Sequence, residues 1–298
     1  MTLKLLVIGA SGLLGSKIVE VATKEGYEVY ATYLSTPISL DGNAFKVDIT
    51  DNEAVTKLFS IVKPDTVIHC AALTDVDKCE VAKELALKVN AYGAAYVAKA
   101  CEKVGAHIVY ISTDYVFDGE KGLYKENDKT NPINFYGYTK LMGENFVSSM
   151  CSRYTVVRTS VIYGARPASG KTNFALWLIE KLSRKQEVNL LEDQYVSPTL
   201  NTNLAYMLLE VCKRELLGVY HLAGASRISR LDFAYKLAEV FNFDKSFIHS
   251  VKMNQLKWVA KRPRDSSLDV SKALKELKEK PLAIEDALKI LKGELKTC

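Results

Sequence analysis

Short apolar segments alternate with amphipathic segments over the first half of the chain. Continuous apolar segments bounded by glycine or polar residues are typical of strands buried on both faces of a parallel sheet. Segments with apolar residues three and four positions apart are typical of covering helices. The predicted strands are 3–8, 28–33, 66–70, 107–112 and 155–159, with a short strand ending at 47–48, and the predicted helices are 13–24, 52–62, 81–104 and 137–149. The alternation predicts an α/β fold with a parallel sheet between two layers of helices.

The alternation becomes less regular after residue 165. Four further helices are predicted at 173–184, 201–214, 230–241 and 284–292, and one further strand at 219–222. We therefore expect a sheet domain over residues 1–165 and a smaller, partly interleaved lobe over residues 166–298. Residues 200–222 are expected to return to the sheet of the first domain.

The composition is that of an ordinary globular protein with a buried core. Of the 298 residues, 48% are hydrophobic and 25% are charged. The net charge of +5 is dispersed, whereas nucleic-acid binders concentrate their positive charge, so we expect no nucleic-acid partner. The six cysteines show no zinc-ligand spacing, so reduced thiols and no metal are expected. Neither a signal peptide nor a membrane span is visible, which predicts a cytoplasmic protein without a membrane partner.

Three glycines separate the first predicted strand from the first predicted helix. In a dinucleotide-binding loop such glycines allow a tight turn, close approach of a pyrophosphate and close helix–strand packing. The free N–H groups and the dipole of the following helix attract the phosphates. A glycine-rich turn without a ligand is the alternative, but the position between strand and helix favours a Rossmann-type doubly wound sheet that binds a dinucleotide. The loop residues expected to contact the dinucleotide are Gly9, Ser11, Gly12, Leu13, Leu14 and Gly15.

The end of the second predicted strand carries no acidic residue that would bind the ribose 2′-hydroxyl of NAD. It offers Tyr33 and the hydroxyl of Ser35, and it would not repel a 2′-phosphate. We therefore expect NADP(H) to be preferred, with NAD(H) as the alternative. After the third strand, Asp48 is expected to hydrogen-bond the adenine and Ile49 to contact it, although a turn or helix-start role fits Asp48 equally well.

Tyr136 and Lys140 lie four residues apart at the start of a predicted helix, and therefore on one face of it. A neighbouring ammonium and the oxidised nicotinamide ring favour a phenolate, so we expect the pKa of Tyr136 to be lowered. Tyr136 is predicted to be the general acid toward a carbonyl oxygen during hydride transfer, and Lys140 to hold the nicotinamide ribose. Ligands of parallel sheets bind beyond the carboxyl ends of strands, so Thr113, with Ser112 as second choice, is expected to hydrogen-bond the carbonyl. A plain amphipathic helix and a capped strand end are the structural alternatives.

Several segments resemble one protein family. The most specific is the octapeptide Ser112-Thr113-Asp114-Tyr115-Val116-Phe117-Asp118-Gly119. The others are 9–15, 71–80, 136–141, 158–160, 193–199, 262–263 and 267–268. They extend over nearly the whole chain, which resembles the extended short-chain dehydrogenases/reductases and, within these, dTDP-4-dehydrorhamnose reductase.

The resemblance implies an NADPH-dependent reduction of the C4 carbonyl of a dTDP-4-keto-6-deoxy-sugar, a step of dTDP-rhamnose biosynthesis. It implies Thr113, Tyr136 and Lys140 as catalytic residues, and a homodimer is common in this superfamily. Further residues implied at the cofactor are Ala71, Ala72 and Thr74, with Asn90 in support. The residues implied at the nucleotide-sugar are Asp114, Val116, Phe117, Val161, Asn173, Gln194, Ser197 and Arg262. Arginine suits the diphosphate because its planar fork binds phosphate oxygens in pairs.

Two departures from the family pattern keep other functions open. Val161 stands where the reductases often have a tryptophan facing the sugar, so the resemblance does not fix the sugar. The segments 162–164 and 262–264 also resemble the regulatory β-subunit of methionine adenosyltransferase, which implies NADP binding without catalysis. A nucleotide-sugar epimerase or dehydratase is the third possibility. Asp114 partly fits the acid of a dehydratase, but no glutamate follows it.

Overall fold

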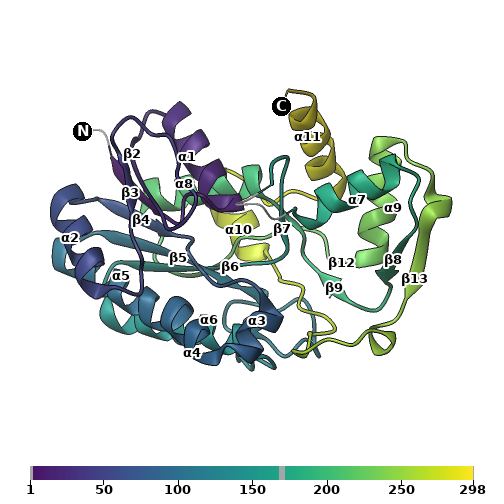
Figure 1. The fold of residues 1–298 in the computed structure, drawn as a ribbon, viewed down its shortest axis with the longest axis horizontal. Helices are drawn as coiled ribbons and strands as arrows, with labels where there is room; N and C mark the ends of the chain where they lie inside the picture. Colours follow the sequence, from purple (N-terminus) through teal and green to yellow (C-terminus); the bar gives the residue numbers. More distant parts are fainter. Residues whose placement is uncertain (1–2, 168–171, 298) are drawn as a thin grey trace.

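A seven-stranded parallel sheet forms the centre of the larger part of the molecule (Figure 1). The computed structural model describes residues 3–167 and 172–297. The strand order is β11-β6-β5-β4-β1-β2-β3, and every neighbouring pair is parallel. The strands are β1 (Lys4–Ile8), β2 (Glu28–Tyr33), β3 (Ala44–Lys46), β4 (Thr66–His69), β5 (His107–Thr113), β6 (Tyr154–Thr159) and β11 (Gly218–His221). The predicted Rossmann-type fold class is confirmed.

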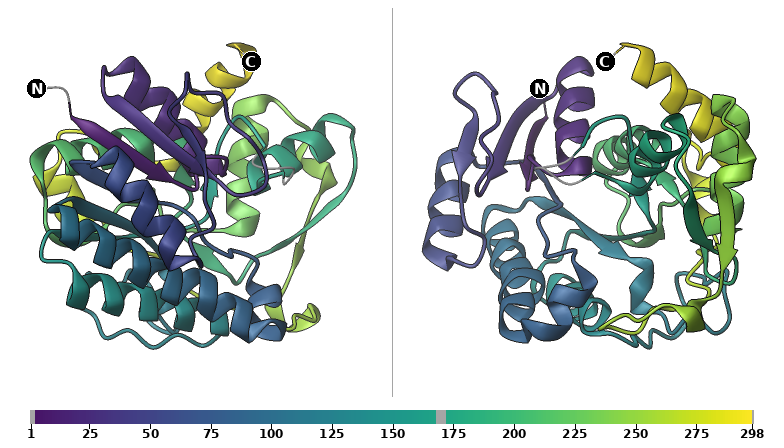
Figure 2. Two further views of the ribbon diagram at one scale, coloured as in Figure 1. Left: turned by 60° about the vertical axis from the view of Figure 1, so that its left-hand side comes forward. Right: turned by 45° about the vertical axis from the view of Figure 1, so that its right-hand side comes forward.

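Helices cover both faces of this sheet, as the two turned views also show (Figure 2). One face carries α1 (Leu13–Lys24), α8 (Asn201–Arg214) and the short α10 (Ser271–Glu276). The other face carries α2 (Asn52–Val62), α5 (Gly93–Val104) and α6 (Phe135–Met150). Each covering helix turns its apolar residues toward the strands, as the spacing of these residues in the sequence predicts.

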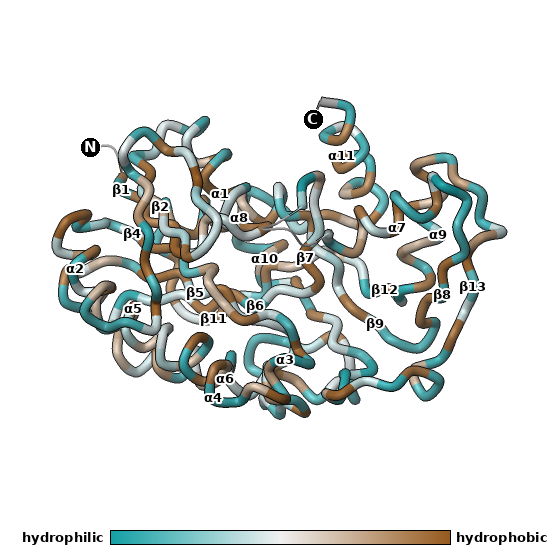
Figure 3. Tube along the Cα trace, viewed as in Figure 1, coloured by the Kyte–Doolittle hydropathy of each residue, from teal (hydrophilic) through white to brown (hydrophobic). Residues whose placement is uncertain are grey.

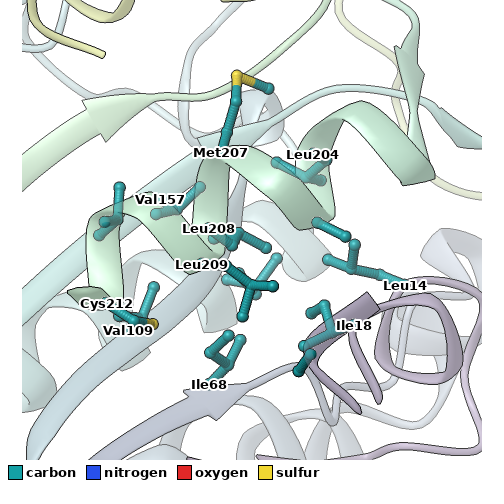
Figure 4. Packing of buried hydrophobic residues seen from close by; sticks show 14 of the residues in the cluster. Leu14, Ile18, Ile68, Val109, Val157, Leu204, Met207, Leu208, Leu209 and Cys212 are labelled. Atoms are coloured by element: carbon teal, nitrogen blue, oxygen red, sulfur yellow. The ribbon is translucent and has the colours of Figure 1, made fainter. Parts of the chain in front are cut away.

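The core on the first face shows why residues far apart in sequence belong to one domain. Ile18 of α1 and Leu204 and Leu208 of α8 pack over Ile68 and the neighbouring strand residues, as Figure 4 shows. These side chains are fully buried. Burying a side chain of this size contributes about 1.5–3 kcal/mol. The helix α8 and the strand β11, which pairs with β6, therefore extend the sheet domain although they follow most of the second lobe in the sequence.

The strand order reverses beside β1, which lies between β2 and β4. The helix that follows β1 packs on one face, whereas α5, between β4 and β5, packs on the other. In open α/β sheets this arrangement separates the two chain segments at the carboxyl ends of the strands and leaves a crevice between them. The candidate site lies in this crevice.

The second lobe packs around a separate hydrophobic core. Its helices are α7 (Phe174–Ser183), α9 (Arg230–Phe241) and α11 (Ile284–Thr297). Its strands form three two-stranded pairs: β7 (Ile162–Tyr163) with β10 (Thr199–Leu200), β8 (Val188–Leu191) with β13 (Ile248–Val251), and β9 (Tyr195–Val196) with β12 (Ile228–Ser229). Short 3-10 turns lie at Asp114–Val116, Lys245–Phe247 and Met253–Gln255. The division at residue 165 remains a proposal.

The helix predicted over residues 81–104 is confirmed over residues 83–104, but it is not a regular α-helix throughout. The short α3 (Val76–Val81) precedes it, and the helix itself consists of α4 (Lys83–Ala86), a π-helical stretch at Leu87–Tyr92 and α5. Most of these boundaries have no signal in the hydrophobic spacing, because a π-helical turn is one residue wider than an α-helical turn and is fixed by tertiary contacts.

The described surface and thiols are unexceptional. In Figure 3 hydrophobic stretches run along the central strands, and hydrophilic residues dominate the outer loops. Cys70, Cys79, Cys101, Cys151 and Cys212 are free, and all but Cys70 are fully buried. Cys298 lies outside the described residues. Within the described ranges, no helix has both the length and the apolar character to span a membrane.

Candidate active site

A cavity of about 590 Å³ lies along the carboxyl ends of β1, β2, β4 and β5. The structure brings most of the predicted cofactor residues to its wall. Those that line it are Gly9, Ser11, Gly12, Leu13, Leu14, Gly15, Tyr33, Asp48, Ile49, Ala71, Ala72, Thr74, Tyr136 and Lys140. Ser35 and Asn90 do not line it: Ser35 is exposed beside the lining residue Leu34, and Asn90 is buried behind the wall.

The glycine loop at the start of α1 keeps this end of the cavity open. Gly9 has φ +84°, a conformation that side chains rarely adopt, and a Cβ there would lie 2.7 Å from the Ala71 nitrogen. A Cβ on Gly15 would collide with the Gly9 carbonyl oxygen. No side chain of the described residues caps α1, so its first N–H groups remain available to an anion. The loop therefore fits the pyrophosphate of a dinucleotide.

Asn90 holds the cofactor-side loop from behind. Its Oδ1 accepts a hydrogen bond from the Leu73 nitrogen at 2.8 Å. Its Nδ2 donates to the Leu73 oxygen and to Oγ1 of Thr139, at 3.1 Å each. Thr139 belongs to α6, between Tyr136 and Lys140. Asn90 thus connects the 71–74 loop to the helix that carries the candidate catalytic pair.

Thr113, Tyr136 and Lys140 meet at the cavity. The helix α6 begins immediately before Tyr136, because Oδ1 of Asn134 caps it by accepting from the Gly137 nitrogen at 2.8 Å. One helical turn then separates the phenol from the amine. The β5 strand ends at Thr113, which places its hydroxyl beside the phenol.

The Lys140 amine is 2% exposed, and its Nζ donates to the Ile111 oxygen at 2.7 Å. Burial lowers the pKa of Lys140 to about 7, although the negative charge of Glu144 acts in the opposite direction. Lys140 is therefore partly neutral near neutral pH, and its side chain lines the cavity.

The Tyr136 phenol has a pKa above that of free tyrosine. Burial raises the pKa, and the hydrogen bond with Thr113 only partly opposes this. The expected lowering by the Lys140 ammonium is thus wrong for the protein without cofactor, because desolvation outweighs it. A phenol that stays protonated is suited to give a proton to a carbonyl oxygen that gains a hydride.

The Asp114 carboxylate organises the end of β5. It is 3% exposed, and it accepts hydrogen bonds from the hydroxyls of Thr113 (2.9 Å), Ser160 (2.9 Å) and Ser266 (2.5 Å). Burial raises its pKa, and the three hydroxyl donors oppose the rise. The sequence gives no signal for Ser266, because it lies 152 positions from Asp114 along the chain.

A buried ion pair lies next to the candidate catalytic residues. Arg158 contacts Glu144 through Nε to Oε1 at 3.0 Å and Nη2 to Oε2 at 2.8 Å. Both side chains are 6% exposed. Oε1 of Glu144 also accepts from the Ser112 hydroxyl at 2.5 Å. Glu144 follows Lys140 by four residues, so helical spacing could have indicated it as a neighbour.

The predicted substrate residues fall into two groups. Asp114, Val161 and Asn173 line the cavity. Val161 has φ +41°, which is unusual for a β-branched residue and marks a local strain beside the site. Asn173 caps α7 by accepting from the Leu176 nitrogen and donates to the Gly164 oxygen.

The remaining predicted substrate residues do not line the cavity. Val116 and Phe117 are fully buried in a small hydrophobic cluster, where Phe117 stacks on Tyr124. Ser197 is buried, and its hydroxyl accepts from the Leu268 nitrogen at 3.0 Å. Gln194 is likewise buried, and Arg262 forms an ion pair with Asp77 at 3.1 Å.

The imidazole of His69 is buried near the candidate catalytic residues. His69 lies at the end of β4, and neither ring nitrogen has a hydrogen-bond partner among the described residues. Its ring lies 5.6 Å from that of Tyr110, and burial, with the nearby Lys140 charge, lowers its pKa to about 3. His69 is therefore neutral.

Residues 3–296 match the protein-family model described as RmlD substrate binding domain. The chain belongs to this family. The earlier resemblance to dTDP-4-dehydrorhamnose reductase is thereby confirmed at the level of the family.

Individual relatives of the family extend over nearly the whole chain. The "Probable low-salt glycan biosynthesis reductase Agl14" of Haloferax volcanii is 38% identical over 289 residues, 96% of each chain. A dTDP-4-dehydrorhamnose reductase of Mycobacterium tuberculosis is 34% identical over 89% of this chain and 84% of its own. The crystal structure of dTDP-4-dehydrorhamnose reductase from Bacillus anthracis in complex with NADP has a TM-score of 0.88 at 32% identity, and covers 99% of this chain and 100% of its own.

Proposed function

We propose that the protein is an NAD(P)-dependent oxidoreductase that uses NADPH to reduce the C4 carbonyl of a dTDP-4-keto-6-deoxy-sugar, as in dTDP-rhamnose biosynthesis. The observation that carries the proposal is that Thr113, Tyr136 and Lys140 share one cavity with the Gly9–Gly15 loop. The relatives named dTDP-4-dehydrorhamnose reductase and the NADP in the Bacillus anthracis structure support the reaction and the cofactor.

The residues present fit a dinucleotide. The uncapped start of α1 and the glycine loop suit the pyrophosphate, and Asp48 and Ile49, which line the cavity, would flank the adenine. At the ribose nearest β2, Tyr33 and Leu34 line the wall and bring no negative charge. A 2′-phosphate would therefore meet no repulsion there, which favours NADPH.

The mechanism assigns one task to each catalytic residue. When bound, the cofactor supplies the hydride that reduces the carbonyl carbon. Tyr136 donates its phenolic proton to the carbonyl oxygen, which becomes the hydroxyl. Lys140 holds the ribose hydroxyls and, when protonated, stabilises the phenolate left behind. Thr113 holds the phenol in place through its hydroxyl.

The test is turnover by the purified protein with dTDP-4-keto-6-deoxy-sugar and NADPH. Tyr136→Phe should lower kcat by roughly 10²–10⁴-fold, the usual contribution of a positioned general acid. Tyr138→Phe is the matched control, because Tyr138 lies on the same helix and is 47% exposed. Its activity should equal that of the unmodified protein.

Three outcomes would contradict the proposal. Binding of NADPH without turnover of any such sugar, together with co-purification of an adenosyltransferase, would favour a regulatory subunit. Tightly bound NAD released on denaturation would favour an epimerase. A clear preference for NADH in kcat/KM would leave the reaction but overturn the choice of cofactor.

A further inference from the structure

Arg230, the first residue of α9, has a positive charge that the protein does not neutralise. Its Nε donates a long hydrogen bond of 3.4 Å to Oε1 of Gln194, and its guanidinium lies 4.9 Å from the centroid of the Phe174 ring. Among the residues that the structure describes, no carboxylate lies within ion-pair distance of it. Most of its hydrogen-bond donors are therefore left for a ligand or for water.

The acidic residues nearest to Arg230 are occupied elsewhere. Asp232, in the same helical turn, accepts the Ser229 hydroxyl at 2.7 Å. Asp114 accepts three hydroxyls, as described above. Burial lowers the pKa of Arg230, while the charges of Tyr115 and Asp114 raise it, so the guanidinium is within electrostatic range of these two residues after β5. An arginine side chain stays charged in proteins.

Arg230 is not among the residues that line the cavity, but it lies beside the wall. Asp114, whose charge acts on Arg230, lines the cavity next to Thr113. The Arg230 guanidinium lies over the ring of Phe174, and Asn173, the residue before Phe174, also lines the cavity.

Arg262, which the sequence suggests for the diphosphate, is placed differently. Its Nη2 lies 3.1 Å from Oδ2 of Asp77, and its guanidinium lies over the Trp258 ring at 5.7 Å. Its charge is thus already paired, and binding of a phosphate would have to disrupt or share this ion pair. Arg158 and Arg227 are paired with carboxylates in the same way.

We propose that Arg230 binds a phosphate group of the nucleoside-diphosphate-sugar substrate. The inference rests on the proposed function for the choice of substrate and names the residue that recognises its negative charge. A planar guanidinium binds phosphate oxygens in pairs, and Phe174 holds its plane. A charged hydrogen bond of this kind contributes about 1.5–3 kcal/mol, which corresponds to roughly a 10- to 150-fold change in affinity.

The test is a calorimetric titration with dTDP and with thymidine. Arg230→Gln should weaken dTDP binding at least about tenfold and leave thymidine binding unchanged, because only dTDP carries the phosphates. Arg230→Lys keeps the positive charge but lacks the planar guanidinium, so its dTDP affinity should lie between those of the unmodified protein and Arg230→Gln. In turnover, Arg230→Gln should raise KM more than it lowers kcat. Arg184→Gln removes one exposed charge from the residue that follows α7 in the same lobe and is the control for net charge.

Folding and NADPH affinity are measured on each variant, so that a misfolded Arg230→Gln protein is recognised and Arg230→Lys then decides. The inference would be overturned if Arg230→Gln bound dTDP as tightly as the unmodified protein does. If Arg230→Gln does not fold, the same comparison is made with Arg230→Lys. The inference would also be overturned by a loss of dTDP affinity in Arg262→Gln alone. Failure of the proposed function looks different, because dTDP would then bind in an Arg230-dependent manner without turnover of a dTDP-keto-sugar.

Discussion

The Thr113 hydroxyl donates a hydrogen bond to Oδ1 of Asp114 at 2.9 Å. The single proton of this hydroxyl is thereby used, and its oxygen accepts a hydrogen bond from the Tyr115 nitrogen at 3.2 Å. The buried Asp114 thus sets the direction in which Thr113 presents its lone pairs. The Thr113 hydroxyl is also a hydrogen-bond neighbour of the Tyr136 phenol, and its contact with the substrate carbonyl stays a prediction.

Replacement of Asp114 by Asn is expected to disturb this orientation. The amide nitrogen cannot accept the hydroxyl bonds that one carboxylate oxygen now accepts, so at least one is lost, at about 1–3 kcal/mol of stability. We expect kcat to fall at least about tenfold with little change in NADPH affinity. Ser266→Ala, which removes one donor and leaves the carboxylate, should have a smaller effect on kcat. Unchanged kcat in Asp114→Asn would contradict the role given to Asp114.

Replacement of Lys140 by Met is expected to abolish most activity and yet stabilise the protein. The pKa of Lys140 is about 7 in the folded state, below the 10.5 of free lysine, so burial of the ammonium opposes folding. The gain in the free energy of unfolding should be on the order of 2 kcal/mol at pH 6. Chemical denaturation at several pH values measures it.

The sign of the pH dependence follows from the direction of the shift. Between about pH 7 and pH 10.5 the unfolded chain binds more protons at Lys140 than the folded chain does. The unmodified protein therefore gains stability from this group as pH rises through that interval. The advantage of Lys140→Met should be full below pH 7 and vanish near pH 10.5. A constant advantage at all pH values would show that Lys140 is not buried as a titrating amine.

Replacement of Glu144 by Gln is expected to affect stability and the pH profile together. It leaves the Arg158 charge buried without a counter-charge, which costs about 3 kcal/mol and lowers Tm by roughly 6–12 °C. Glu144 also raises the pKa of Lys140, so its loss should shift the corresponding limb of the kcat–pH profile to lower pH.

The double variant Glu144→Leu with Arg158→Met separates these two effects. It removes both charges, so it should unfold at a higher temperature than Glu144→Gln while keeping the shifted pH limb. If the limb of the kcat–pH profile were unshifted in both variants, the Glu144–Arg158 ion pair would have only a structural role.

Replacement of Ser35 by Asp is expected to reverse the cofactor preference. A carboxylate at the end of β2 would repel the 2′-phosphate of NADPH and accept hydrogen bonds from the 2′-hydroxyl of NADH. The ratio of kcat/KM for NADPH to that for NADH should fall at least about tenfold. Ser39→Asp, exposed on the same loop, is the charge control. An equal ratio in Ser35→Asp and Ser39→Asp would place the 2′-phosphate elsewhere.

Much of the sheet domain is predictable from the sequence, because its long elements carry periodic signals. The ranges predicted for α1, α2, α8 and α9 agree with the structure at both ends. The strands of the second lobe have no such signal, because β7, β9, β10 and β12 are two residues long and show no alternation. Their pairing is decided by contacts between distant segments, as with Ile228 and Val196.

The residues of the candidate site can likewise be divided into those that the sequence predicts and those that it does not. The glycine loop and the Tyr136–Lys140 pair are local patterns, and the sequence places them beside the cavity correctly. The partners that set their properties are not local: Ser160 and Ser266 bind Asp114 across long separations, and the charge of Arg230, from the second lobe, acts on Asp114. The direction of the Tyr136 pKa also depends on burial, which the sequence does not contain.

The side chain of Asn90 has a consequence for how this protein tolerates change. The Asn90 amide hydrogen-bonds Leu73 in the 71–74 loop and Thr139 in α6, so it couples this loop to the helix that carries Tyr136 and Lys140. A substitution in the 71–74 loop would then misalign the Tyr136 phenol as well as weaken dinucleotide binding. Substitutions intended to change the preference between NADPH and NADH should therefore leave this loop unchanged and target the residues that follow β2.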